Sequence, residues 1–99
     1  MRLKKDSRMY VRLDYKTGEK NLNNQDIQDH MAFVEKVSRE RCFAGGGFSN
    51  TDGGMCLFEA ASMKEALTVF KNDPIIQRGF YRYEIYEWNL AVLSDTAAE

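Results

Sequence analysis

Histidine and cysteine are scarce in this sequence, and their scarcity excludes whole classes of site. The 99 residues include one histidine and two cysteines, Cys42 and Cys56, which form no CxxC motif. A structural zinc site needs several such ligands at short spacings, so we expect no metal site, and no motif calls for a cofactor. Two thiols without a secretion signal are typical of a reduced, cytoplasmic protein.

Excess charge and long apolar runs are also absent. Lys and Arg number 14 against 15 Asp and Glu, which gives a net charge of −1. Such a balance gives no electrostatic attraction to nucleic acid or to an anionic membrane surface. No run approaches the ~18 apolar residues of a membrane span, and no apolar segment follows the basic N-terminus. We therefore predict a soluble, cytoplasmic chain with no nucleic-acid or membrane partner.

The length is that of one domain, and we predict a single domain over 1–99 with its core at about 8–93. A chain this short buries roughly two thirds of its surface. Its core is therefore thin, and a dimer interface would add to it. The hydrophobic fraction of 43 % and the aromatic fraction of 12 % exclude a disordered chain.

The spacing of apolar residues predicts four strands and two helices. Apolar and polar side chains alternate over 8–15, as in a half-buried strand. Over 25–41 the apolar residues Ile27, Met31 and Val34 recur at helical spacing. Glycine-rich turns, a capping box and an aromatic run define the other elements. These are strands over 42–50, 53–61 and 80–93, and a helix that opens at Ser62 and ends near 72–74.

Residues typical of helix ends mark the limits of both helices. Asn24 is expected to cap the first helix through its side-chain oxygen. Ser62 and Glu65 have the spacing of a capping box at the start of the second helix. Pro74 cannot continue that helix without a kink, so we expect the helix to end just before it.

The order of these elements, β-α-β-β-α-β, is that of the ferredoxin-like fold. We therefore predict an α+β protein with a four-stranded antiparallel sheet and both helices on one face. The last strand has apolar groups on both sides, with Tyr83 and Ile85 on one and Tyr86 and Trp88 on the other. Because the helices cover only one face, we expect a homodimer, or a higher homo-oligomer, whose sheets pack face to face. An exposed aromatic patch is the alternative.

The predicted topology brings His30 and Asp73 together. His30 lies in the opening turns of the first helix and Asp73 at the end of the second, and both points lie at the same edge of the sheet. A carboxylate that holds one imidazole nitrogen fixes the ring tautomer and leaves the other nitrogen as a positioned acid or base. Alternatively, His30 is a polar residue beside the apolar stripe, and Asp73 only caps the turn that Pro74 opens.

Three consecutive glycines in "AGGGFS" are unusual inside a strand, because glycine weakens strands. One interpretation is a β-bulge or an unusual backbone angle. The other is close approach of a ligand, with backbone N–H groups as donors. The run matches neither the phosphate-binding loop GxxxxGK[ST] nor the dinucleotide fingerprint GxGxxG. On the first strand, Tyr10 and Arg12 are candidates to line a pocket, with structural roles as the simpler interpretation.

Four segments, "DHMAFVEKV", "AGGGFSNTDGGM", "FEAASMKEA" and "NDPIIQRGFYRYEIYEW", together resemble the YCII-related family, and the resemblance spans residues 9–90. It implies the dimeric α+β barrel form of the ferredoxin-like fold. It also implies a pocket with a histidine and an aspartate proposed as catalytic. His30 matches the family's histidine in "DH", and Asp73 matches its aspartate in "DP".

The glycine run also has a counterpart in that family. Gly46 and Gly47 fall where the family has its "GGP" or "AGP" stretch. Phe48 stands where the family's usual proline would be, which alters the local backbone. The resemblance thus points to Gly46, Gly47 and Phe48 as the residues that contact a substrate.

We carry three hypotheses of function. The first is a small-molecule enzyme, lyase- or isomerase-like, in which His30 is the general acid or base and Asp73 orients it. No serine or cysteine nucleophile is evident beside the histidine. The alternative is a non-catalytic dimeric module that binds a metabolite or supports a partner enzyme. The third is an RNA-binding domain, which is disfavoured because "GGMCLFEA" lacks the basic and aromatic pattern of an RNA-binding strand.

Overall fold

The computed structural model describes residues 3, 5–6 and 8–96, and its elements follow the predicted order with one addition. A one-turn helix, α3, follows the second predicted helix. None of the described helices is long and apolar enough to cross a membrane. The strands are β1 (Arg8–Lys16), β2 (Phe43–Gly47), β3 (Gly54–Glu59) and β4 (Tyr81–Asn89), and the helices are α1 (Asn24–Glu40), α2 (Met63–Val69) and α3 (Pro74–Gln77).

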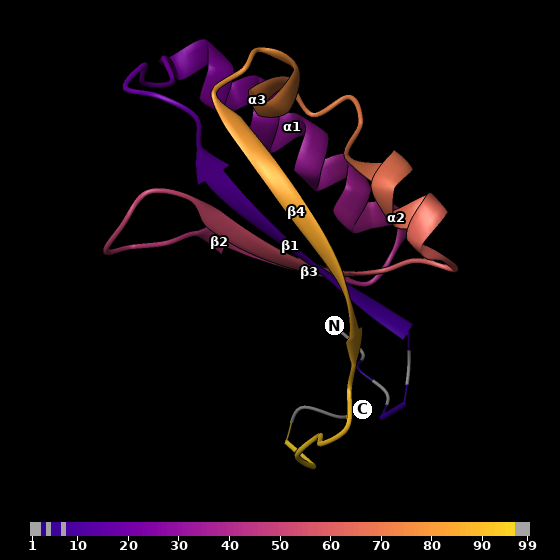
Figure 1. Cartoon of the computed structure of the whole chain (residues 1–99). Coiled ribbons are helices and arrows are strands. Elements are labelled where there is room, and N and C mark those ends of the chain that lie inside the picture. Colours follow the sequence, from indigo (N-terminus) through magenta and orange to yellow (C-terminus); the bar gives the residue numbers. More distant parts are fainter. Residues whose placement is uncertain (1–2, 4, 7, 97–99) are drawn as a thin grey trace.

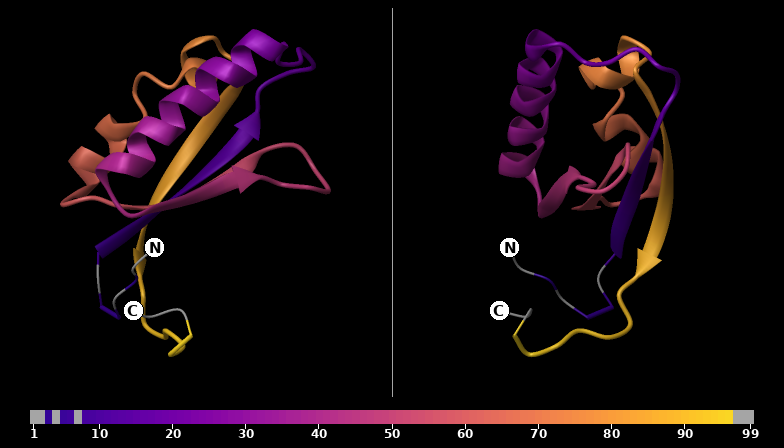
Figure 2. Two further views of the ribbon diagram at one scale, coloured as in Figure 1. Left: turned by 180° about the vertical axis from the view of Figure 1, so that it is seen from behind. Right: turned by 90° about the vertical axis from the view of Figure 1, so that its left-hand side faces the viewer.

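The four strands form one antiparallel sheet in the order β2-β3-β1-β4. Figure 1 shows the helices grouped together, and the edge-on view in Figure 2 places them on one side of the sheet. This confirms the predicted α+β, ferredoxin-like fold. β1 lies in the interior of the sheet, so side chains on its helix-facing side have a strand on each side and helices above them.

The core lies between the helices and the covered face of the sheet. Tyr10 of β1 pairs with Phe58 of β3, and both side chains are buried against the helices. Phe70, which follows α2, meets Phe58 edge-on with ring centroids 4.8 Å apart and an interplanar angle of 82°. Each such buried aromatic contributes about 1.5–3 kcal/mol, and an edge-to-face pair adds ~0.5–1.5 kcal/mol.

Asn23, and not the predicted Asn24, caps α1. The Asn23 Oδ1 atom accepts a hydrogen bond from the Asp26 N–H at 2.8 Å, and the Asp26 Oδ2 atom accepts one from the Asn23 N–H at 3.0 Å. This reciprocal pair is a capping box, which needs an acceptor side chain three residues after the cap. Of the two asparagines, only Asn23 has one at that spacing, because the residue three positions after Asn24 is the apolar Ile27. The prediction of Asn24 was therefore wrong by one residue.

The helix α2 is shorter than predicted, ending at Val69 instead of near 72–74. Phe70 follows it and is fully buried in the core. The chain then turns, and Asp73 caps the separate helix α3 with Pro74 at its first position. A proline fits there because its missing N–H would have no partner within the helix. Pro74 therefore opens a helix and does not simply end the preceding one.

Strand pairing explains the other boundaries. β4 ends at Asn89 and not at 93, because Asn89 pairs with Arg8, where β1 begins. β2 and β3 are shorter than predicted and pair residue for residue up to the Gly47–Gly54 pair. The bulge interpretation of the glycine run is therefore wrong for β2.

The face of the sheet that points away from the helices is mainly apolar, with the ion pair of Arg82 and Glu84 near the start of β4. Met55, Tyr86 and Trp88 on this face are 45 %, 50 % and 40 % exposed, and together with the half-buried apolar residues of β1 and β3 they form one surface. This confirms that β4 carries apolar groups on both sides. By the strand register, the uncovered face includes Val11, Leu13, Met55, Leu57, Tyr86 and Trp88.

Candidate active site

Asp73 lies at the start of α3, and its buried carboxylate meets three elements. The Oδ1 atom accepts a hydrogen bond from the Ile75 N–H at 3.1 Å, which caps α3. The same atom lies 2.8 Å from Nδ1 of His30 on α1. The Oδ2 atom accepts a hydrogen bond from Nη1 of Arg12 on β1 at 3.0 Å. Asp73 is therefore both a helix cap and the partner of His30, so the two interpretations of this residue are compatible.

The surroundings of Asp73 keep its carboxyl group ionised. Burial by itself raises the pKa of Asp73. The hydrogen bond and charge of His30, together with the charge and hydrogen bond of Arg12, outweigh burial and hold the pKa of Asp73 below its ordinary value of 3.8. Asp73 thus supplies a fixed negative charge next to the imidazole ring at neutral pH.

His30 lies in the first half of α1, with one ring nitrogen held and the other available. Nδ1 faces Asp73, whereas Nε2 makes no hydrogen bond to any described residue. The side chain is 23 % exposed and lines a cavity. A ring held at Nδ1 has a defined tautomer and orientation, so Nε2 is placed to take or give a proton.

Arg12 is buried between two aromatic rings and two carboxylates. Its guanidinium carbon lies 4.5 Å from the centroid of the Phe70 ring and 5.2 Å from that of Tyr83. Besides its bond to Asp73, Arg12 donates Nε to Oδ1 of Asp14 at 2.6 Å. Its Nη2 is buried and has no hydrogen-bond partner among the described residues. A buried charge of this kind is tolerated because it is paired on two sides.

Asp14 and Asp73 are both paired with Arg12, but the environment of Asp14 raises its pKa, whereas that of Asp73 lowers it. Burial raises the pKa of Asp14 above its ordinary value of 3.8, and the charge and hydrogen bond of Arg12 offset this only in part. The Asp14 side chain is 16 % exposed and lines the same cavity as His30. We call Arg12, Asp14, His30 and Asp73 the charged cluster.

A cavity of about 260 Å³ lies beside the charged cluster. Arg12, Asp14 and His30 are the guanidinium, carboxylate and imidazole side chains of its lining. The other walls are apolar side chains and glycine backbone from α1, β2 and β3, together with residues near α3 and β4. Ligand pockets of drug size are larger, at roughly 300–1,000 Å³, so this cavity suits a small, mainly apolar molecule with one polar end.

Two of the three predicted substrate-contact residues lie in this cavity. Gly46 and Gly47 line it, whereas Phe48 does not and has a 42 % exposed side chain. A Cβ on Gly45 would lie 2.8 Å from the Cβ of Cys56, so packing requires glycine there. A Cβ on Gly46 or Gly47 would meet nothing closer than 3.7 Å, so the lack of side chains there leaves open space.

The cavity contains no activated thiol. Cys56 lines it, but burial raises the pKa of the Cys56 thiol to about 12, and nucleophilic attack needs the thiolate. Within the part of the chain that the structure describes, no group of three His, Cys, Asp or Glu side chains is placed to hold a metal ion.

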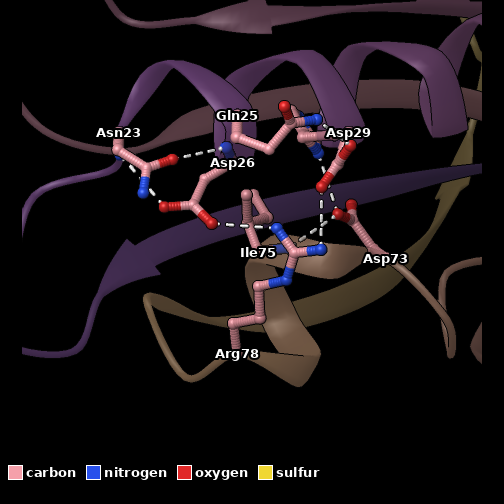
Figure 3. A network of polar contacts seen from close by, with 8 residues as sticks. Asn23, Gln25, Asp26, Asp29, Asp73, Ile75 and Arg78 are labelled. Carbon is pink, nitrogen blue, oxygen red and sulfur yellow. Dashed lines mark hydrogen bonds and ion pairs between the residues drawn. The ribbon is translucent and has the colours of Figure 1, made fainter.

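A second polar network fastens α3 to the start of α1 (Figure 3). Arg78, at the end of α3, donates Nη1 to Oδ1 of Asp26 and Nη2 to Oδ2 of Asp29, both at 2.8 Å. Asp26 belongs to the capping box of α1, and Asp29 immediately precedes His30. The network therefore joins the two helices on which the contact between His30 and Asp73 depends.

Comparison with known proteins assigns the family. Residues 9–89 match the YCII-related domain family. The chain belongs to this family. YjpA, an uncharacterized protein of Bacillus subtilis (strain 168), is 30 % identical over 83 residues, which are 83 % of this chain and 98 % of that protein. YCII-related proteins form dimeric α+β barrels, so the resemblance seen in the sequence is confirmed at the level of family and fold.

Sequence reasoning missed part of the charged cluster of this YCII-related domain. It placed His30 and Asp73 correctly relative to each other, and it named Arg12 as a candidate to line a pocket, with a structural role as the simpler interpretation. Arg12 does line the cavity, whereas Asp14 was given no role. A signal was present, since Tyr10, Arg12 and Asp14 alternate along one strand and so share one face. Tyr10 is buried on that face, which makes a charged pair beside it a candidate for a functional site.

Proposed function

We propose that this protein is a small-molecule enzyme that uses His30 and Asp73 for general acid/base chemistry in a lyase- or isomerase-like reaction. The observation that carries the proposal is the 2.8 Å contact between Nδ1 of His30 and the buried Oδ1 of Asp73, made at the wall of a mainly apolar cavity. A positioned acid or base contributes typically ~10²–10⁴-fold to a rate.

The two residues have different roles in this proposal. His30 is the catalytic residue, because its Nε2 is available to a molecule in the cavity. Asp73 is a positioning residue that fixes the tautomer of the ring and stabilises its charged form. The backbone of Gly46 and Gly47, where side chains would have room, allows close approach of a polar group of the substrate.

Proton transfer fits this site better than acyl transfer does. Acyl transfer needs an activated nucleophile next to the base. Cys56 lines the cavity, but its raised pKa keeps the thiol protonated. No serine lines the cavity within the described part of the chain.

We also propose that the protein is a homodimer that pairs through the uncovered face of the sheet. Tyr86, Trp88 and Met55 leave an apolar surface on that face, and an isologous contact would bury it twice. The dimeric barrels of the family support this arrangement.

The first experiment is an NMR titration of the His30 ring in the wild type and in Asp73→Asn. An asparagine caps helices as well as aspartate does, so the variant keeps the α3 cap but loses the negative charge. We expect His30 to lose its proton at a lower pH in Asp73→Asn. Glu35→Gln is the matched control, because it removes a charge from the exposed side of the same helix and should leave the titration unchanged.

Either outcome separates the two remaining functions. Coupling between His30 and Asp73 supports the enzyme hypothesis and directs a substrate screen towards acid/base chemistry. If the titration of His30 is the same in the wild type and in Asp73→Asn, the result contradicts the proposed pair and favours the non-catalytic, metabolite-binding module.

A further inference from the structure

Asp14 is the carboxylate of the charged cluster that has a hydrogen-bond partner on only one of its oxygens. Its Oδ1 accepts the Arg12 hydrogen bond, whereas Oδ2 has no hydrogen-bond partner among the described residues. Asp73, by contrast, has partners on both oxygens and no exposure. Asp14 and His30 both line the cavity. A molecule bound in the cavity therefore has both an imidazole and a carboxylate group in the cavity wall.

The formal charges of the cluster can be counted. Arg12 carries one positive charge, and Asp14 and Asp73 carry two negative charges when both are ionised. With a proton on His30, the sum of these charges is zero. The cluster then holds an acid, the imidazolium of His30, and a base, the carboxylate of Asp14.

The two carboxylates are suited to different tasks. The pKa of Asp73 lies below its ordinary value and that of Asp14 lies above it. Opposite displacements of neighbouring carboxyl groups are a mark of divided acid/base roles. Asp73 stays charged and holds His30, whereas Asp14 is the stronger base and accepts a proton more readily.

The remaining groups around Asp14 are neutral at neutral pH. On β3, burial raises the pKa of the Cys56 thiol to about 12. On β4, burial together with the charges of Asp52 and Asp14 raises the pKa of Tyr81. No described group facing Asp14 therefore competes with His30 and Arg12 as its partner in charge.

We propose that Asp14 is a second catalytic residue, acting as a base with His30 as the acid on an uncharged, largely apolar carbonyl compound. This inference rests on the proposed function of His30 and adds the substrate class and the partner in proton transfer. An anionic substrate is disfavoured, since Arg12 already faces two carboxylates and its remaining Nη2 is buried. A negative charge placed beside Asp14 would meet repulsion in a site with little water.

The reaction that follows is a proton shift that needs no co-reactant. Oδ2 of Asp14 takes a proton from the carbon next to the carbonyl group, and the electron pair of that C–H bond forms a C=C bond. Nε2 of His30 gives its proton to the carbonyl oxygen, which produces an enol. If the substrate carries a neighbouring double bond, Asp14 returns the proton to the far carbon and the hydroxyl proton returns to His30. The substrate is isomerised and both residues are restored.

The substrate class is tested by binding two single-ring probes, uncharged 4-methylphenol and anionic benzoate, followed by NMR at neutral pH. We expect 4-methylphenol to shift the amide signals of Gly46 and Gly47 in the wild type, and benzoate to bind more weakly. In Asp14→Asn, which removes the negative charge, benzoate should bind about tenfold more tightly than in the wild type. Benzoate that binds the wild type as well as 4-methylphenol does, or a cavity that takes neither probe, overturns the proposal.

The proton shift is tested with cyclohex-3-en-1-one, whose conversion to the conjugated enone is followed by ultraviolet absorbance. We expect the wild type to accelerate the conversion and Asp14→Asn to lose roughly 10²–10⁴-fold of that acceleration. Asp14→Glu, which keeps a carboxylate, should retain part of it, and the control Glu35→Gln should retain all of it. Thermal unfolding of each variant shows that the fold is intact.

The variants also separate this inference from the proposed function. A loss of rate in His30→Gln but not in Asp14→Asn overturns the role of Asp14 alone. A rate that neither change affects overturns the role of both residues. A wild type that does not accelerate the conversion overturns the proton shift on uncharged enones.

Discussion

The two faces of the sheet reverse the usual distribution of polarity. The face covered by the helices holds Arg12 and Asp14 beside its aromatic core, whereas the uncovered face presents Tyr86 and Trp88. Buried charges cost free energy unless they are paired, and exposed apolar surfaces of this kind mark contacts with another molecule. The covered face therefore carries the site that we propose for chemistry, and the uncovered face carries the surface that we propose for a partner.

The largest effect on the covered face is expected from Arg12→Met. The change leaves the carboxylates of Asp14 and Asp73 without their shared cation, and losing one partner of a buried ion pair costs about 3–5 kcal/mol. Urea denaturation at neutral pH measures this loss. The matched control is Arg8→Met, which removes an exposed arginine paired with Glu87 and should cost below ~1 kcal/mol. Equal losses in the two variants would contradict the structural role of the covered charges.

On the uncovered face, Trp88→Glu should weaken self-association while leaving the fold of each chain intact. Replacing a central aromatic residue of an interface costs about 2 kcal/mol or more of binding free energy. In Trp88→Glu, the two introduced carboxylates would also repel each other across the two-fold axis. Sedimentation velocity measures the change, with circular dichroism to follow the fold. Leu67→Glu is the control, because Leu67 is 48 % exposed on α2 and not on the sheet. An unchanged assembly in Trp88→Glu would refute pairing through this face.

The two carboxylates of the covered face should give opposite dependences of stability on pH. The folded-state pKa of Asp73 is lowered, so its contribution is complete above 3.8 and is lost as the pH falls through that lowered value. The folded-state pKa of Asp14 is raised, so its contribution decreases as the pH rises from 3.8 through the raised value.

Denaturation of Asp73→Asn and Asp14→Asn across this range measures both effects. In Asp73→Asn, the free energy of unfolding should fall less steeply as the pH drops below 3.8. In Asp14→Asn, the decrease in the free energy of unfolding as the pH rises above 3.8 should be absent. Curves that change in the same direction in the two variants would show that the carboxylates do not differ as described.

The smallest effect is expected at the rim of the covered face, from Arg78→Gln. The Arg78 side chain is 43 % exposed, so its ion pairs with Asp26 and Asp29 stabilise the protein by below ~1 kcal/mol. We expect little change in unfolding but faster hydrogen exchange of the α3 amides, because the link to α1 is lost. Lys71→Gln, an exposed lysine just before α3, serves as the control. Exchange that is the same in both variants would limit Arg78 to a surface role.

The meeting of His30 and Asp73 could be predicted because it depends only on the order of the elements. In a β-α-β-β-α-β sheet, the start of the first helix and the end of the helical segment before the last strand lie at one edge. The identity of the cap could also be read, since "NNQD" contains the spacing of a capping box at Asn23 but not at Asn24. The division of the second helical segment into α2 and α3 could not be predicted from the sequence, because it depends on the burial of the Phe70 ring in the core.

The sequence by itself determined the fold class and the presence of apolar groups on both sides of β4, because these depend on local periodicity and element order. The family followed from the resemblance of four segments to the YCII-related family. Only the tertiary structure decided that the face with Arg12 and Asp14 is the one the helices cover. A strand alternates its side chains in the same way whichever face is buried. What lies across that face, here the Phe70 ring and the carboxylate of Asp73, determines whether a charge is solvated or becomes part of a site.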